Sequence, residues 1–331
     1  MGKHPVAVTM RVVAEHCGVS LATASKAFNP RSEDIGAATR ERILAAAREL
    51  GFQPDRSTSQ RARKRWQNIG LAWGRAAPRG DGIYAELCET LARTIKPWGY
   101  HLLFTPVEDA ADWRLMQRSQ RLDGVVVVET MADEVLAELE ASGYPAVLLN
   151  LPTSRKLPRI APDDRGGSAQ LVEHLAALGH RQIAYVPRQA STSHVSEDDR
   201  WAGVRDAAAS AGVAVVRAES PLVIAGVQAG RLTAAITYSH REALQLLPLV
   251  HAAGLSVPGD LSIAVGSDVP CLAHTHPPLT SLEIPIPAMA RQAVTLLVDL
   301  IELTAPPPTQ LQLAKEEICL RASTGKPGER S

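Results

Sequence analysis

The sequence has few cysteines, few aromatic residues and no long apolar run. Its four cysteines are Cys17, Cys88, Cys271 and Cys319. They form no C-x-x-C pair, which argues against a disulfide framework or a zinc module and favours a reducing compartment. Apolar runs such as G-V-V-V-V-E have the length of strands, not of membrane spans. The first residues lack the apolar core of a signal peptide. These absences predict a soluble cytoplasmic protein.

The common catalytic motifs are also missing. The sequence contains no G-x-S-x-G elbow, no G-x-G-x-x-G, no G-x-x-x-x-G-K-[ST] and no H-E-x-x-H. Its ten histidines are scattered. The closest pair, His274 and His276, lies beside Pro277, which favours a turn over a metal site. We therefore expect no enzyme activity, no metal and no cofactor.

Charge is unevenly distributed along the 331 residues, a length that predicts two or three domains. Residues 1–66 hold twelve Lys and Arg against six Asp and Glu. The rest of the chain holds twenty-three against twenty-nine, so the formal charges of the two parts cancel. A basic head on an acidic body indicates a head that binds a polyanion.

The head carries the pattern of two short helices joined by a tight turn. A helix beginning near Met10 is ended by Gly18, which suits the left-handed conformation. Ser20 is a good N-cap for a second helix over Leu21–Phe28. A third helical pattern follows and stops at Gly51. Residues 1–51 are thus predicted to form a helix-turn-helix domain.

These helices could belong to an ordinary small bundle. Two features favour DNA binding instead. The second helix, S-L-A-T-A-S-K-A-F-N, is small, polar and basic on its outer face, which suits entry into a major groove. The head is also net basic.

The stretches V-T-M-R-V-V-A-E-H-C-G-V-S-L-A-T-A-S-K-A-F-N and A-T-R-E-R-I-L-A-A-A-R-E-L-G-F-Q-P-D carry a family resemblance. They resemble the head of the LacI/GalR family of bacterial transcription regulators. The resemblance implies that the start of the second helix contacts bases, through Leu21, Ala22 and Lys26. It assigns backbone-positioning contacts to Thr23, Ser25 and Asn29. Because Leu21 and Ala22 cannot hydrogen-bond a base, Lys26 is the one strong candidate for guanine.

The linker over residues 52–66 departs from the family pattern. The family usually places a leucine in a hinge helix there, where it wedges into the minor groove. The corresponding residue is Arg61. An arginine can enter a narrow minor groove, but it is a poor apolar wedge. A solvated basic linker is the equally weighted alternative.

Residues 67–331 alternate strand-like and helix-like segments, which predicts an α/β body with parallel sheets and right-handed crossovers. The stretches D-D-R-G-G-S-A-Q-L-V-E-H-L-A-A-L-G-H-R-Q-I-A-Y-V and V-H-A-A-G-L-S-V-P-G-D-L-S-I-A-V-G-S-D continue the resemblance. It implies two lobes similar to periplasmic sugar-binding proteins, with a ligand in the cleft. Lobe one is expected over about 67–158 and 285–308, and lobe two over about 159–284 and 309–323.

Ligand sites in such sheets lie beyond the C-terminal ends of strands. Asn150 ends a predicted strand, and Asp268 follows another. Arg200 begins a predicted helix in D-R-W-A-G, where the family places an arginine that grips the effector. Asp268 matches the family's cleft aspartate. The structural alternatives are a turn or cap role for Asp268 and a surface ion pair for Arg200.

Other cleft positions depart from the family. Ser239 and His240 replace the usual Asn-Asp, and D-G-I-Y, ending at Tyr84, replaces Asn-Pro-Phe-Phe. Tyr84 can still stack on a ring, whereas a protonated His240 favours an anion. A sugar acid, a sugar phosphate, an unusual oligosaccharide and loss of effector binding all remain open.

The resulting prediction is a homodimeric, sequence-specific transcription regulator, a repressor by family expectation, that binds a near-palindromic double-stranded operator and a small carbohydrate-like effector. An alternative is a regulator whose body binds a protein partner. A solute-binding protein or an enzyme is less favoured.

Overall fold

The computed structural model describes residues 10–28, 35–50, 65–74, 82–119, 121–128, 131–151, 153–189, 195–302 and 311–328. The chain divides into two units, Met1–Arg65 and Trp66–Ser331. We call them the head and the body and describe each by itself.

Within its described residues, the head contains the helices α1 (Met10–His16), α2 (Leu21–Ala27) and α3 (Ala37–Glu49). Their apolar faces meet in a small core built around Val13, Ala27, Ile43 and Ala47. All four side chains are at most 2% exposed, so helices too short to be stable alone are held by packing.

The first lobe of the body is a six-stranded parallel sheet with the strand order β11-β5-β4-β3-β1-β2. Its strands are β1 (Asn68–Trp73), β2 (His101–Pro106), β3 (Gly124–Val128), β4 (Ala146–Leu149), β5 (Arg159–Pro162) and β11 (Leu311–Ala314). Its helices are α5 (Gly82–Ile95), the 3₁₀ turn η1 (Lys96–Trp98), α6 (Ala110–Ser119), α7 (Asp133–Ser142) and α12 (Ile286–Glu302).

The second lobe repeats this plan with the order β12-β10-β9-β8-β6-β7, in which only the edge strand β12 is antiparallel. Its strands are β6 (Gln182–Val186), β7 (Ala214–Arg217), β8 (Ala234–Thr237), β9 (Ser262–Val265), β10 (Thr280–Glu283) and β12 (Glu317–Cys319). Its helices are α8 (Asp164–Ala177), α9 (Val195–Ala211), α10 (Ser220–Gln228), α11 (His240–Ala252) and the 3₁₀ turn η2 (Pro270–His274).

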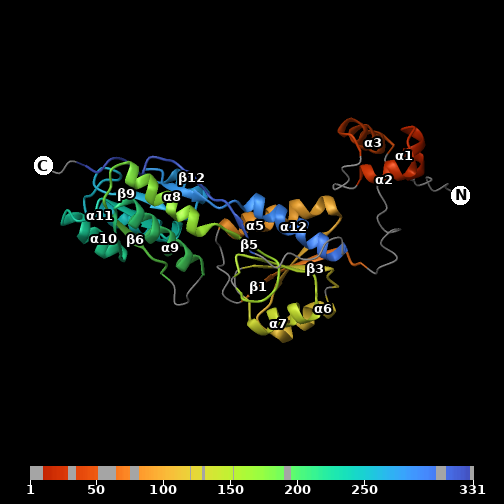
Figure 1. Cartoon of the computed structure of the whole chain (residues 1–331), viewed down its shortest axis with the longest axis horizontal. Coiled ribbons are helices and arrows are strands. Elements are labelled where there is room, and N and C mark those ends of the chain that lie inside the picture. Colours follow the sequence, from red (N-terminus) through yellow and green to blue (C-terminus); the bar gives the residue numbers. More distant parts are fainter. Residues whose placement is uncertain are drawn as a thin grey trace. The chain divides into compact units, whose positions relative to one another are not determined.

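Each sheet is covered by helices on both faces, as parallel sheets require. Figure 1 shows α5 and α12 on one face of the first sheet and α6 and α7 on the other. In the second lobe, α10 and α11 cover one face, and α8 and α9 cover the other. The central strands β3, β4, β8 and β9 are therefore buried along their whole length.

The chain crosses between the lobes three times: from β5 to α8, from β10 to α12 and from β11 to β12. The expected lobe boundaries near residues 158 and 308 are therefore too early. Both β5 and β11 pair within the first sheet, so these crossings lie just after Pro162 and Ala314. The boundary was missed because neither strand carries the continuous buried apolar run of the central strands, so each is defined by its pairing.

Among the described residues, no helix has both the length and the apolar character needed to cross a membrane.

Candidate functional site

The turn between α1 and α2 has the geometry that the sequence predicts. Gly18 adopts a positive φ of 62°, and the N–H of Val19 donates to the carbonyl of Ala14 at 3.0 Å. The Oγ of Ser20 accepts a hydrogen bond from the N–H of Thr23 at 3.0 Å, which makes Ser20 the N-cap of α2. These local bonds fix the angle at which α2 leaves α1.

Apart from Arg61 in the linker, the predicted DNA-contacting residues fall on α2 or just beyond it in the sequence. Lys26 is exposed and the side chain of Leu21 is 48% exposed, so both lie on the outer surface of the head. Thr23 is half-buried, and its hydroxyl is hydrogen-bonded to that of Ser20 at 2.8 Å. Ala22 and Ser25 belong to α2, while their side chains lie outside the described part. Asn29 and Arg61 also lie outside the described residues.

The body contains a cavity of about 150 Å³ between the two lobes. The C-terminal ends of strands from both sheets converge on it: Val128, Leu149 and Pro162 from the first lobe, and residues following β6, β8 and β9 from the second. This is the position at which open α/β sheets bind ligands. Of the predicted effector residues, the cavity brings together Tyr84, Asn150, Arg200, Ser239 and His240.

The lobe-one wall of this cavity is mostly apolar. It consists of Ile83, Tyr84, Leu87, Val128, Leu149, Asn150, Pro162, Ile284, Ile286 and Met289. Tyr84 contacts Trp73 edge to face, with ring centroids 5.9 Å apart. Asn150 has a positive φ of 49°, which asparagine tolerates. Its Oδ1 accepts a hydrogen bond from the Ser196 hydroxyl of lobe two at 3.3 Å, a direct polar contact between the lobes.

The lobe-two wall is polar. It consists of Arg188, Gln189, Ser196, Arg200, Tyr238, Ser239, His240, Arg241, Glu242 and Ser267. Many of these groups already hold one another. Glu242 accepts hydrogen bonds from the N–H and hydroxyl of Ser239 at 3.0 and 2.5 Å, and from the Gln189 N–H at 3.2 Å. The capping box of α11 thus forms part of the cavity wall.

Arg200 is the most deeply placed charge in the wall. It lies inside α9, which begins at Val195, so it does not begin a helix as expected from the sequence. Its Nε donates to Asp164 at 2.6 Å and its Nη1 donates to the carbonyl of Tyr238 at 2.7 Å. The side chains of Arg200 and Asp164 are only 6% and 4% exposed, so the pair is a buried ion pair. Burial alone would lower the pKa of Arg200, but Asp164 and Glu316 more than offset this and raise it.

His240 is buried at the N-terminus of α11 and contacts Ser267. Its backbone N–H donates to the Ser267 Oγ at 3.1 Å, and its Nδ1 lies 3.1 Å from the same oxygen. The ring is therefore oriented by a neighbour on the adjacent strand end before any ligand enters.

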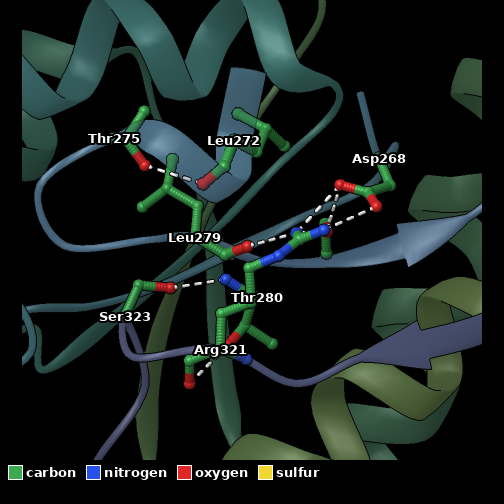
Figure 2. Close-up of polar contacts among 8 residues, drawn as sticks. Asp268, Leu272, Thr275, Leu279, Thr280, Arg321 and Ser323 are labelled. Atoms are coloured by element: carbon green, nitrogen blue, oxygen red, sulfur yellow. Dashed lines mark hydrogen bonds and ion pairs between the residues drawn. The ribbon is translucent and has the colours of Figure 1, made fainter. Parts of the chain in front are cut away.

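Asp268 does not line the cavity, contrary to the expectation. Figure 2 shows its carboxylate facing Arg321, whose Nη1 and Nη2 donate to its two oxygens at 2.9 and 2.7 Å. The hydroxyl of Ser281 donates to the same carboxylate at 2.8 Å. Asp268 is thus held in a bidentate ion pair, and the preceding residue, Ser267, takes its place in the wall.

Several cavity residues were not anticipated. Arg188 and Gln189 follow the end of β6, so the rule that placed Asn150 would also have found them. Ile286 and Met289 come from α12, which the sequence analysis did not identify. Within the described residues, no cluster of His, Cys, Asp and Glu is arranged to hold a metal ion.

Comparison with known proteins agrees with the fold of both units. The profile of bacterial regulatory proteins of the lacI family matches residues 9–55. The profile of periplasmic binding proteins and the sugar binding domain of the LacI family matches residues 77–239. A periplasmic binding protein-like domain matches residues 172–324.

Full-length relatives are similar across both units. The chain is 30% identical over 347 residues to an uncharacterized HTH-type transcriptional regulator in the aml 5′ region of Streptomyces limosus, covering 97% of this chain and 96% of the relative. A transcriptional regulator CelR–cellobiose complex is 25% identical with a TM-score of 0.66, covering 96% of this chain and 99% of that one.

A Lac repressor dimer bound to operator and the anti-inducer ONPF is also 25% identical, with a TM-score of 0.67, covering 97% of this chain and all of that one. The chain therefore belongs to the lacI family of bacterial regulatory proteins and is a DNA-binding transcription regulator, not an enzyme.

Proposed function

We propose that this protein is a cytoplasmic homodimeric regulator that binds a near-palindromic operator and changes its operator affinity when a small carbohydrate or sugar derivative enters the cavity between its lobes. The observation that carries the proposal is the cavity itself. It lies at the converging strand ends of two lobes, in a chain that also carries a helix-turn-helix head.

The two walls of the cavity suit a carbohydrate. A sugar ring has apolar faces and a rim of hydroxyl groups. The apolar faces can lie against Tyr84 and Leu149, and the hydroxyl groups can hydrogen-bond to the polar wall. The similar CelR structure is a complex with cellobiose. We assign the central grip to Arg200, because its planar guanidinium can donate to paired oxygens.

Ligand binding would act on DNA affinity through lobe closure. The ligand has to bind one arrangement of the lobes better than the other, because equal affinity for both shifts nothing. A coupling free energy of about 1–3 kcal/mol is typical of such regulation. Asn150 and Ser196 both line the cavity, so ligand entry would act directly on this contact between the lobes.

On the DNA side we assign base contacts to Leu21, Ala22 and Lys26 and phosphate contacts to Thr23, Ser25 and Asn29. Lys26 would donate to a guanine, while Leu21 and Ala22 would contact thymine methyl groups or exclude other bases. Arg61 would enter the minor groove electrostatically.

Selection of bound sequences from random duplex DNA, at low and moderate salt, tests the proposal. The full-length chain should recover a palindromic motif. Lys26→Ala should bind that motif about 1–3 kcal/mol more weakly and lose preference at one position of each half-site. Lys64→Ala, in the basic linker, is the charge-matched control and should leave the motif unchanged. No enriched motif with the full-length chain would contradict the proposal.

A further inference from the structure

Glu316 lies at one of the crossings between the lobes. It follows β11 of the first sheet and precedes β12 of the second. The crossing from β5 to α8 lies beside it, because the N–H of Asp163 donates to the carbonyl of Ala314 at 2.8 Å. The Gln170 side chain of α8 donates to the Glu316 carbonyl at 3.1 Å. A change in the angle between the lobes would therefore bend both of these crossing segments.

The side chain of Glu316 is fully buried. Neither carboxyl oxygen has a hydrogen-bond partner among the described residues. The carboxyl lies against Gly167 of α8, where even a Cβ atom would overlap its Oε2. Glycine at this position therefore makes the space for the carboxyl group. A buried polar group without a partner costs free energy, so stability does not explain a glutamate here.

Three charged groups act on this carboxyl. Arg200 of α9 attracts its charged form, while Asp164 and Asp163, at the start of α8, repel it. Arg200 already shares a hydrogen bond with Asp164 and lines the cavity. The neighbours of Glu316 along the chain, Lys315 and Glu317, are exposed. Burial is the largest influence, and it raises the pKa of Glu316 to about 8.

We propose that Glu316 is a positioning residue for Arg200, and that the proton on its buried carboxyl sets how tightly Arg200 is held at the crossing between the lobes. With the proton in place, Asp164 is the single carboxylate that balances the guanidinium. Without it, a second carboxylate attracts Arg200 away from the cavity and competes with any oxygen of a ligand.

The inference deepens the proposed function and rests on it in one respect, the assignment of the ligand grip to Arg200. It then follows that the ligand response weakens as pH rises through the titration of Glu316. Cells that become more alkaline would respond less to the same ligand concentration.

The test is an NMR titration of the full-length protein labelled with ¹⁵N-arginine, from pH 6 to pH 9.5, without ligand or operator. The Nε–H of Arg200 is buried and donates to Asp164 at 2.6 Å, so its proton should exchange slowly enough to observe. Arg200→Lys assigns the resonance by its loss. In the wild type this resonance should shift with a midpoint near pH 8.

Glu316→Gln should abolish the shift and leave the resonance at its low-pH position. Glu317→Gln makes the same chemical change at the exposed neighbour and should keep the titration. A flat wild-type resonance, or an unchanged titration in Glu316→Gln, would overturn the proposal. The wild-type titration stands even if Glu316→Gln folds poorly. Because neither ligand nor DNA is present, failure here is separable from failure of the proposed function.

Discussion

The two lobes of the body share one plan and present opposite chemistry to the cavity between them. Each has a six-stranded sheet with helices on both faces. Lobe one contributes mostly apolar side chains to the cavity, and lobe two contributes polar and charged ones. Lobe one therefore offers a ligand apolar contact area, while lobe two offers directional hydrogen bonds and charge.

Both lobes have surface ion pairs, but among the described pairs the deeply buried one belongs to lobe two. Arg155 of lobe one pairs with Asp133 and Glu140 at the surface. Its hydrogen bonds lower the pKa of Asp133, and the backbone N–H of Lys156, together with Arg155, lowers the pKa of Glu140. Arg200 and Asp164 of lobe two are buried together. Surface pairs contribute little, whereas a buried pair is costly to break. Changes to lobe two should thus disturb charge balance, and changes to lobe one should disturb packing.

The largest effect is expected for Arg200→Ala. It leaves Asp164 buried without its partner, so the free energy of unfolding should fall by roughly 3–5 kcal/mol. Urea denaturation followed by circular dichroism measures this. Adding Asp164→Asn should recover part of the loss, and Arg165→Ala, at an exposed pair, is the control. A loss below about 1 kcal/mol would show that the pair is not buried in solution.

In lobe one, Leu149→Ala tests packing. Leu149 is fully buried in β4 and lines the cavity. Its truncation should cost about 2–5 kcal/mol and enlarge the cavity. Urea denaturation at pH 6 and at pH 8.5 should show the same loss in the free energy of unfolding, because the substitution removes no charged group. A strong pH dependence of this loss would contradict the division between the lobes.

Glu316→Gln should raise the free energy of unfolding, whereas Arg200→Ala and Leu149→Ala lower it. Burial raises the pKa of Glu316 above its ordinary value of 4.5, so the folded state retains a proton that the unfolded state releases. The wild type should therefore lose stability as pH rises from about 4.5 to about 8. Glu316→Gln lacks this loss, so its free energy of unfolding should rise relative to that of the wild type by a few kcal/mol across this pH range. Thermal unfolding across pH measures it, with Glu317→Gln as control; a constant difference would argue against the buried titration.

The smallest effect concerns the contact between the lobes. Ser196→Ala removes the hydrogen bond to Asn150, which at 3.3 Å should contribute about 0.5–1 kcal/mol. Ser210→Ala removes a bond within the same helix and should leave the lobes unaffected. Small-angle X-ray scattering of both variants should detect a more open average arrangement of the lobes in Ser196→Ala alone. An identical profile for both would remove this contact from the closure mechanism.

Local signals explain what the sequence could predict. Gly18 and Ser20 determine the turn of the head through their own backbone and side-chain geometry. The rule for strand ends placed Asn150 in the cavity because it directly follows the short buried run of β4, and the family resemblance placed His240 there.

Long-range partners explain what it could not predict. Asp268 is taken from the cavity by Arg321, 53 residues away in the chain. Glu316 and Glu317 are adjacent in the chain, but the Glu316 carboxyl is buried against Gly167 of α8, about 150 residues away, whereas Glu317 pairs in β12 and is exposed. The crossing after β11 was missed for the same reason, since its four residues are defined by pairing with β5.

The most direct test of the account is the operator affinity of the full-length protein in the presence of a panel of ligands. The panel contains neutral mono- and disaccharides including cellobiose, sugar acids and sugar phosphates. We predict that at least one changes the dissociation constant for the selected operator about 5–150-fold, and that Arg200→Ala abolishes the change while operator binding persists. If no ligand alters operator affinity, or if Arg200→Ala responds like the wild type, the cavity is not the regulatory site.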